Sequence, residues 1–373
     1  MAQAKRGLLP IGVHLTQDAV WMAQLEQDGD DVRVVSKATC SLTSDADTLA
    51  RVVSVDHGPA GDAGTDIAEH AYAKGRMFVA QKIASNGFCG KDGAISLPQD
   101  QLVIKHLRLP PMNPEELNAA LPYELQGKLP FNPQEAIVRH IVAGSVSENS
   151  ETKQDVLVLA TPKHVVEKHV AAMSRLGLTV TGVGVEPCAM CYAYAFAASR
   201  AQPSQAGPAC VMIVYLGAQT TYVAILRGQE TTFVKGVGHG TDRWVEAVAK
   251  VKGISLEEAV ELTSLWRTTP SPATFEDAVD TYNRVRTSLE HLVDEIESCI
   301  RYHASLARGA GVDHVHFVGP GARDRALVRV VSARLAIPCD VGDPFGVVTG
   351  TPDPETAEPE MAVAVGLSLF GAR

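Results

Sequence analysis

Two stretches of the chain, about two hundred residues apart, show the same alternation of apolar and polar positions. VHLTQDAVWMAQL from Val13 and VYLGAQTTYVAIL from Val214 each read as a short apolar strand, a polar turn and a second, alternating strand. A hairpin that occurs twice predicts two halves that begin alike. Two short hairpins can also match by chance, so the prediction depends on whether the elements that follow match as well.

Between the hairpins, the pattern predicts a separate α+β module over residues 94–182. Asn113 followed by Pro114 is typical of a helix start, because asparagine can cap free N–H groups and proline fits the first turn. For this region and the residues before it we expect a helix at 66–75, a strand at 77–83, a strand at 102–110, a helix at 114–127, a strand at 155–161 and a helix closed by Gly177.

After a linker at 199–208, the second hairpin opens the other half of the chain. Ser255 and Glu258 have the spacing of a capping box. We expect a helix at 256–264, a long amphipathic helix at 274–308, a strand at 314–318, a helix at 323–335 and a final helix at 361–370.

The composition is that of a folded globular protein, with 46% hydrophobic and 20% charged residues in a chain of 373. Acidic residues outnumber basic ones by 43 to 33, and no block of lysine and arginine occurs, so we expect no nucleic-acid partner. The seven cysteines are scattered, which predicts no disulfide framework and fits a reducing compartment.

Two features bear on the membrane. The first residues contain no cleavable apolar segment, and the most apolar stretch, 187–198, is shorter than the ~20 residues a bilayer span requires. That stretch reads as a buried helix. We therefore expect a cytoplasmic protein without direct membrane insertion, which reaches the membrane through a partner.

Three short motifs could carry chemistry. Cys188 and Cys191 have thiol-redox spacing, but their apolar helical context favours core packing. His314 and His316 share a strand face and could begin a metal site, yet no third ligand is close in sequence, which favours a structural pair. The turn 319–322 has the form of a phosphate or nucleoside cradle, although such turns also use glycine for conformational reasons.

Several longer segments together resemble the type IV pilus assembly protein PilM family. They are LPYELQGKLPF at 121–131, VLVLATPKHVVEKHVAAMSRLGLTVTGVGVEP at 156–187, VDEIESCIRYH, VGPGA, DPF at 343–345 and AVAVGLSLF. The most specific part is the Pro-Tyr-Glu segment at 122–124 followed by Leu-Pro-Phe at 129–131. The resemblance implies an α/β fold, actin-like (ribonuclease H-like) and duplicated, with an inserted FtsA-like α+β subdomain.

The resemblance also implies a division of the chain and a partner. The first half would comprise 1–93, 183–205 and 358–373, the inserted module 94–182, the second half 208–238 and 312–348, and a helical subdomain of that half 239–311. The family lies at the cytoplasmic face of the inner membrane and binds the short tail of the bitopic protein PilN. Other pilus assembly proteins are further expected partners, and a homo-oligomer is possible.

The chain departs from the family at the nucleotide site. The first phosphate loop of the family reads Asp-x-Gly-(Ser/Thr)-x-x-x-Lys, and here its positions hold His14, Thr16 and Trp21. The second loop begins with aspartate in the family and with Tyr215 here. The acidic residue of the connecting helix motif is replaced by Gly184, with Glu186 two residues further on. Magnesium prefers carboxylates and water, so the resemblance predicts a dismantled metal site.

Hydrolysis is therefore not expected, because phosphoryl transfer depends on positioning and metal neutralisation. No cofactor is expected, although ATP binding without turnover stays open, as does the alternative that Trp21 fills the pocket rather than serving as an ordinary core residue. The degenerate nucleotide-site candidates are His14, Thr16, Gln17, Tyr215, Gly217, Thr220, Thr221, Gly319 and Gly321.

For the partner, the candidate groove or hinge residues are Tyr123, Leu129 and Phe131, which could equally form the core of the module. The reading that follows is an actin-like scaffold or adaptor of pilus assembly. Two alternatives are an actin-like ATPase, against which His14 and Tyr215 argue, and a GspL-like component of type II secretion, against which the missing membrane helix argues.

Overall fold

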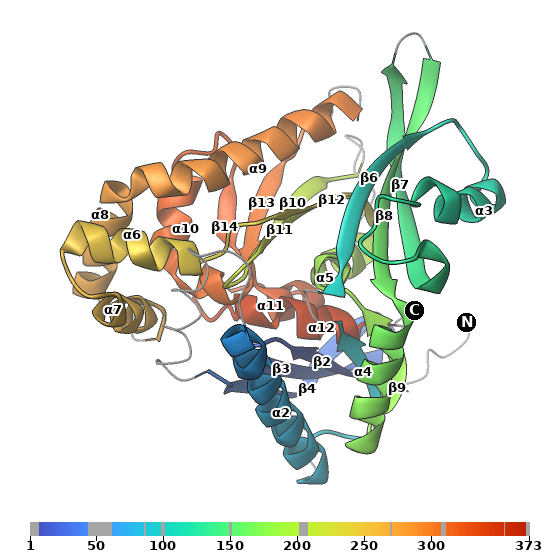
Figure 1. The fold of residues 1–373 in the computed structure, drawn as a ribbon. Helices are drawn as coiled ribbons and strands as arrows, with labels where there is room; N and C mark the ends of the chain where they lie inside the picture. Colours follow the sequence, from blue (N-terminus) through green and yellow to red (C-terminus); the bar gives the residue numbers. More distant parts are fainter. Residues whose placement is uncertain are drawn as a thin grey trace.

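The computed structural model describes residues 7–43, 62–85, 87–97, 101–148, 151–200, 208–268, 271–306, 311–353 and 355–370. Their strands form three sheets (Figure 1). In the first sheet β2 pairs antiparallel with β3 and parallel with β5, β4 is antiparallel to β3, and β9 is parallel to β5. Its strands are β1 (Gly7–Leu8), β2 (Ile11–Leu15), β3 (Ala19–Asp28), β4 (Asp31–Ser41), β5 (Asp92–Ser96) and β9 (Thr179–Gly184).

The second sheet repeats this pattern of pairing. Its order is β12-β11-β10-β13-β14, with two antiparallel pairs followed by two parallel ones. The first sheet shows the same succession along β4-β3-β2-β5-β9, so the predicted duplication is confirmed by elements beyond the two hairpins. The strands are β10 (Cys210–Leu216), β11 (Thr221–Arg227), β12 (Glu230–Val237), β13 (His314–Val318) and β14 (Cys339–Val341).

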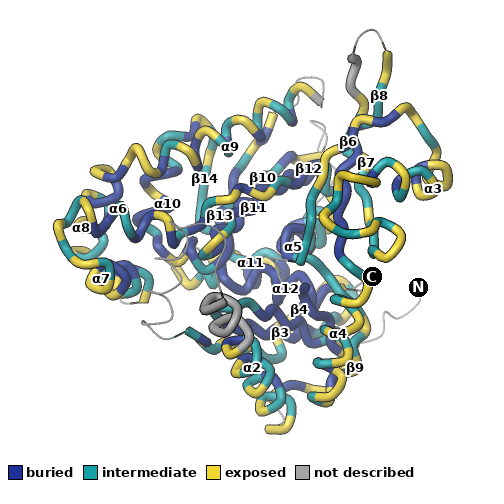
Figure 2. The backbone as a smooth tube through the Cα atoms, viewed as in Figure 1, coloured by how far each residue is buried: buried dark blue, intermediate teal, exposed yellow. Residues whose placement is uncertain are grey.

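Two helices, α5 (Glu186–Arg200) and α12 (Ala362–Ser368), lie between the two sheets (Figures 1 and 2). All of α12 is buried, whereas the buried residues of α5 lie in its first part, up to Tyr194. Their close approach requires glycine. A Cβ added at Gly366 would lie 1.8 Å from the carbonyl oxygen of Ala189, and one at Gly12 would lie 1.9 Å from that of Ala364. Backbone therefore packs directly on backbone at the centre of the molecule.

The third sheet is antiparallel, with the order β6-β8-β7, and belongs to the inserted region. The predicted N-cap at Asn113 is confirmed, because its side chain accepts from the N–H groups of Glu115 and Glu116. The elements are β6 (Val103–Leu109), α3 (Pro114–Glu124), η2 (Pro133–Glu135), β7 (Ala136–Glu148), β8 (Glu151–Pro162) and α4 (Lys163–Arg175). Strands β5 and β9, at the ends of the predicted module, pair in the first sheet; the division into domains remains a prediction.

Helices cover one face of the second sheet, where Met212 and Phe317 meet Trp244, Leu292 and Val331 in one apolar core. The capping box of Ser255 and Glu258 forms as predicted. The helical elements are α6 (Asp242–Lys252), α7 (Leu256–Thr268), α8 (Pro272–Arg284), α9 (Arg286–Leu306), η3 (Pro320–Arg323), α10 (Arg325–Ser332), α11 (Pro344–Thr349) and η4 (Pro359–Met361).

Two predicted elements are wrong. The strand expected at 77–83 is the end of one helix, α2 (Asp62–Ala84), in which Ala71, Gly75, Val79 and Ile83 recur every fourth residue along the side that faces the first sheet. The short apolar run at 77–83 suggested a strand, because the four-residue spacing is recognisable only over the whole helix.

The helix expected at 274–308 is two helices, because the backbone at Val285 leaves the helical conformation, with a ψ of 18°. Apolar positions continue on both sides of the break, so the hydrophobic pattern alone gives no sign of it. No helix in the described part of the chain has the length and apolar character that crossing a bilayer needs.

Candidate functional site

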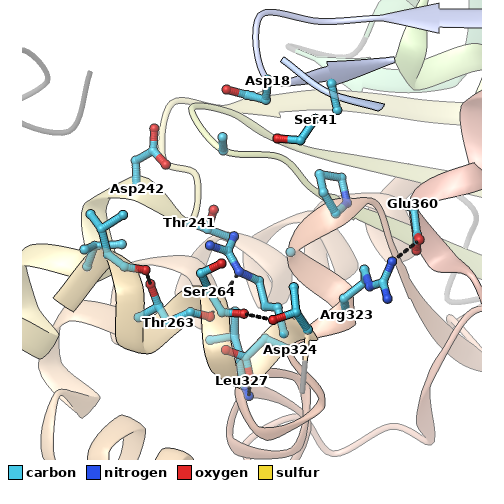
Figure 3. A pocket seen from close by; sticks show the side chains of 18 of the residues that line it. Asp18, Ser41, Thr241, Asp242, Thr263, Ser264, Arg323, Asp324, Leu327 and Glu360 are labelled. Atoms are coloured by element: carbon cyan, nitrogen blue, oxygen red, sulfur yellow. Dashed lines mark hydrogen bonds and ion pairs between the residues drawn. The ribbon is translucent and has the colours of Figure 1, made fainter. Parts of the chain in front are cut away.

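A cavity of about 290 Å³, called here the main cavity, lies where the β3–β4 end of the first sheet faces helices of the second half (Figure 3). Of the predicted nucleotide-site residues, Gly321 lines it, and so does Trp21. The polar residues that line it include Asp18, Ser41, Thr241, Asp242, Thr263, Ser264, Arg267, Arg323, Asp324 and Glu360. Sequence reasoning missed these polar residues, because they are spread along the chain from Asp18 to Glu360 and share no motif.

The wall of the main cavity contains two fixed polar pairs. Arg323 Nη1 lies 2.6 Å from Glu360 Oε1, and burial raises the pKa of this glutamate although Arg323 opposes the shift. The Tyr282 hydroxyl donates to Asp324 Oδ2 over 2.6 Å, and burial raises the pKa of both groups. Figure 3 shows the pair of Arg323 and Glu360, with Asp324 beside Arg323 and with Asp18 and Ser41 farther up in the view.

A buried pair occupies the positions that the family resemblance assigns to a magnesium site. His14 on β2 is fully buried, and its Nε2 lies 2.6 Å from Oε1 of Glu186 at the start of α5. Trp21 stacks on the His14 ring with centroids 5.0 Å apart, and Tyr215 meets it edge-on at 6.2 Å. Burial raises the pKa of Tyr215 far above its ordinary value, so it supplies no phenolate oxygen. Three of the substituted positions thus form one cluster with Glu186.

The first predicted phosphate loop folds on itself. The N–H group of Thr16 donates to the carbonyl of Ala19 over 3.0 Å, and the Thr16 hydroxyl oxygen accepts from the N–H groups of Asp18 and Ala19. Gln17 is partly buried in the same turn. Three N–H groups of this turn, those of Thr16, Asp18 and Ala19, are therefore used inside it and do not point to a phosphate.

The second predicted loop is closed in the same way. The N–H group of Gly217 donates to the carbonyl of Thr220, and the Thr221 hydroxyl donates to the carbonyl of His239 over 2.7 Å. The N–H groups of Thr241 and Asp242 donate to carbonyls of this loop and so hold α6 against it. At the third turn, the N–H group of Gly319 donates to the carbonyl of Pro359 over 2.8 Å, with a φ of 88° that favours glycine.

The predicted partner-binding residues differ in burial. Tyr123 on α3 is 72% exposed, so the alternative that it belongs to the module core is wrong. Leu129 is partly buried and packs on the core of the module, and Phe131 is also partly buried. We call Tyr123, Leu129 and Phe131 the module surface.

The paired cysteines lie inside α5, as the apolar context predicted. Cys191 is fully buried, and burial raises the pKa of Cys188 to about 11, far from the range of a reactive thiolate. This places both thiols in the packing between the sheets rather than in redox chemistry.

The two matching sheets, the helices between them and the inserted module define an actin-like α/β protein. A family model described as type IV pilus assembly protein PilM matches residues 71–371, and the chain belongs to this family.

The chain is also similar to solved structures. The chain is similar to one in a PilM-PilN type IV pilus biogenesis complex, with a TM-score of 0.68, 17% identity and 98% of each chain covered. A weaker likeness is to the ethanolamine utilization protein EutJ from Carboxydothermus hydrogenoformans, with a TM-score of 0.47 and 13% identity, covering 99% of this chain and 92% of EutJ. Another is to the cytoplasmic domain of EpsL, an inner membrane component of the type II secretion system of Vibrio cholerae, with a TM-score of 0.35 and 12% identity, covering 62% of this chain and 71% of that one. At these identities the first match shows the fold alone, and the other two carry no argument.

Proposed function

We propose that this chain is a cytoplasmic adaptor of type IV pilus assembly, which binds the tail of a PilN-like inner-membrane protein and does not hydrolyse ATP. The observation that carries the proposal is the full-length likeness to a chain of a PilM-PilN complex, together with the family match. In this proposal the membrane association comes from the partner.

The module surface is the proposed place of docking. Tyr123 exposes most of its ring on α3, and an exposed aromatic side chain offers a large contact area at a small entropic cost. The short helix that carries it is anchored by Leu117, Leu121 and Leu125, which pack on the antiparallel sheet. An extended tail could therefore bind there without any rearrangement of the module core.

The absence of hydrolysis is argued from the closed nucleotide positions. Nε2 of His14 contacts Glu186 where the family's first loop carries an acid, and imidazole does not substitute for a hard oxygen ligand of magnesium. The N–H groups of Thr16, Gly217 and Gly319 are all occupied by carbonyls of the chain. These facts support the adaptor and argue against the ATPase alternative.

The test is calorimetric titration of the full chain with a peptide that carries the cytoplasmic tail of its PilN-like protein. We expect saturable binding that Tyr123→Ala weakens at least tenfold at an unchanged melting temperature. Met77→Ala is the matched control, because Met77 is a 73% exposed apolar residue on another helix, α2. If the wild-type chain does not bind the tail, the adaptor function is wrong; if both variants bind as well as wild type, the module surface is wrong.

A further inference from the structure

Three metal-ligating side chains meet at an edge of the second sheet, outside the main cavity. His314 and His316 lie two residues apart on β13, and Asp340 on the neighbouring β14 is the register partner of His316. His314 Nε2 lies 2.8 Å from Asp340 Oδ2, and His316 Nδ1 lies 2.6 Å from Asp340 Oδ1. Parallel pairing supplies the third ligand that could not be found close to the two histidines in sequence.

The three side chains are held in place and are also accessible to solvent. Strand β14 has three residues and ends the sheet, so the cluster lies at an open edge. The side chains of His314, His316 and Asp340 are 32%, 19% and 40% exposed. The ring of Tyr194 stacks on His316 with centroids 4.8 Å apart, which restricts the orientation of that imidazole. An ion can therefore enter from solvent, and the ligands are already gathered.

The charge of the cluster favours a cation. Among the described side chains, no lysine or arginine forms an ion pair with Asp340, whose two carboxylate oxygens are each shared with one imidazole. An imidazole balances the carboxylate charge only while it is protonated. A divalent ion would balance it with both rings neutral.

We propose that His314, His316 and Asp340 bind one divalent transition-metal ion of the Zn²⁺ class. Two imidazole nitrogens and one carboxylate oxygen suit this class, whereas Mg²⁺ and Ca²⁺ prefer all-oxygen sites. Bonds of about 2.0–2.1 Å around a tetrahedral ion place the ligand atoms roughly 3.3 Å apart. The three ligand atoms already lie within 4.8 Å of one another, so small side-chain rotations suffice, and water takes the remaining coordination position.

Binding exchanges protons for the ion. The nitrogens that now face the carboxylate carry protons, since an ionised carboxylate only accepts hydrogen bonds. Each nitrogen needs its lone pair to bind metal, so a neutral ring moves its proton to the other nitrogen and a protonated ring releases one to solvent. The ion then joins β13 to the edge strand β14 by bonds stronger than the two hydrogen bonds it replaces.

The experiment is titration of the chelator-treated full chain with ZnCl₂, followed by calorimetry and by thermal melting. We expect one saturable site per chain and a melting temperature that rises with Zn²⁺ and not with Mg²⁺. His316→Gln and His314→Gln are each expected to weaken binding at least tenfold. His164→Gln, an exposed histidine on α4, is the matched control and should bind as the wild type does.

Cobalt(II) provides a second readout that separates this site from the cysteines. We expect a visible spectrum of nitrogen and oxygen ligation without a thiolate charge-transfer band, and its loss in the His314→Gln/His316→Gln double variant, whose folding is checked by circular dichroism. Absence of saturable Zn²⁺ binding by the wild type, or binding that survives in the folded double variant, would overturn the proposal.

Discussion

The Nε2 atom of His14 and the Oε1 atom of Glu186 lie 2.6 Å apart, both side chains buried, one on β2 of the first sheet and the other at the start of the helix between the sheets. The two side chains contact each other directly at positions that the family resemblance assigns to a metal site. A buried pair is costly to break from one side, because the remaining group keeps its desolvation penalty without its partner. The contribution of the pair to the free energy of unfolding can therefore be measured by comparing a single with a double variant.

Replacing His14 alone should destabilise the fold. His14→Phe keeps an aromatic ring against Trp21 but leaves the carboxylate of Glu186 without its imidazole partner, so we expect a loss of about 3–5 kcal/mol in the free energy of unfolding. Urea denaturation measures it. Adding Glu186→Met in the same chain removes the carboxyl group that has lost its contact with His14 and should restore most of the loss. A double variant no more stable than His14→Phe would show that the pair is not the source of the effect.

Magnesium should not strengthen any interaction with ATP. Binding to an intact site at a hundredfold excess over the dissociation constant would stabilise the fold by about 2.7 kcal/mol. We expect thermal melting with ATP to give the same curve with magnesium and with a chelator. His14→Asp combined with Tyr215→Asp should not create the dependence, because the Thr16 turn remains closed by its own hydrogen bonds. Stabilisation seen only when magnesium is present would contradict the closed site.

Local signals in the sequence predicted local structure well. The repeated hairpins at Val13 and Val214 form neighbouring antiparallel strands in two sheets with matching topology, and the caps at Asn113 and Ser255 form as their side-chain chemistry requires. Such features depend on neighbours in the sequence, so the sequence contains them. The break at Val285 could not be predicted in this way, because the apolar stripe is the same on both sides of it.

The sites depended on contacts that no local pattern records. Glu186 reaches His14 across 172 positions, and Asp340 reaches His316 across 24 through the pairing of parallel strands. The closure of the predicted phosphate loops also follows from tertiary contacts, such as the hydrogen bond from Thr221 to the carbonyl of His239. The sequence showed that the family's acids are replaced. It did not show which side chains lie against the residues that replace them.

The helix crossing at the centre of the molecule should not tolerate a methyl group. Gly366→Ala would gain helix propensity of about 1 kcal/mol, but its Cβ would meet the backbone oxygen of Ala189 at 1.8 Å, which side-chain rotation cannot relieve. We expect a net loss of about 1–3 kcal/mol or insoluble protein. Gly238→Ala is the control, because nothing lies within 4 Å of the added Cβ there. Equal stability of the two variants would show that α5 and α12 do not pack as described.

The buried carboxyl of Asp324 should make stability depend on pH in an unusual direction. Burial raises its pKa above the ordinary 3.8, while hydrogen bonds from Tyr282 and Leu327 and the charge of Arg267 oppose the shift. Between the unfolded and the raised folded pKa the native state binds more protons, so this group's contribution falls as pH rises through that window.

Asp324→Asn removes that titration while keeping one acceptor oxygen. It loses one hydrogen bond, a pH-independent cost of about 0.5–1.5 kcal/mol, but the difference in unfolding free energy should shift in favour of the variant as pH rises from about 4 to 7. Urea denaturation across this range measures the difference. In Tyr282→Phe, loss of the hydrogen bond to the ionised carboxylate should raise the pKa of Asp324 further and widen the window in which stability is lost. A difference between Asp324→Asn and wild type that stays constant with pH would contradict the raised pKa.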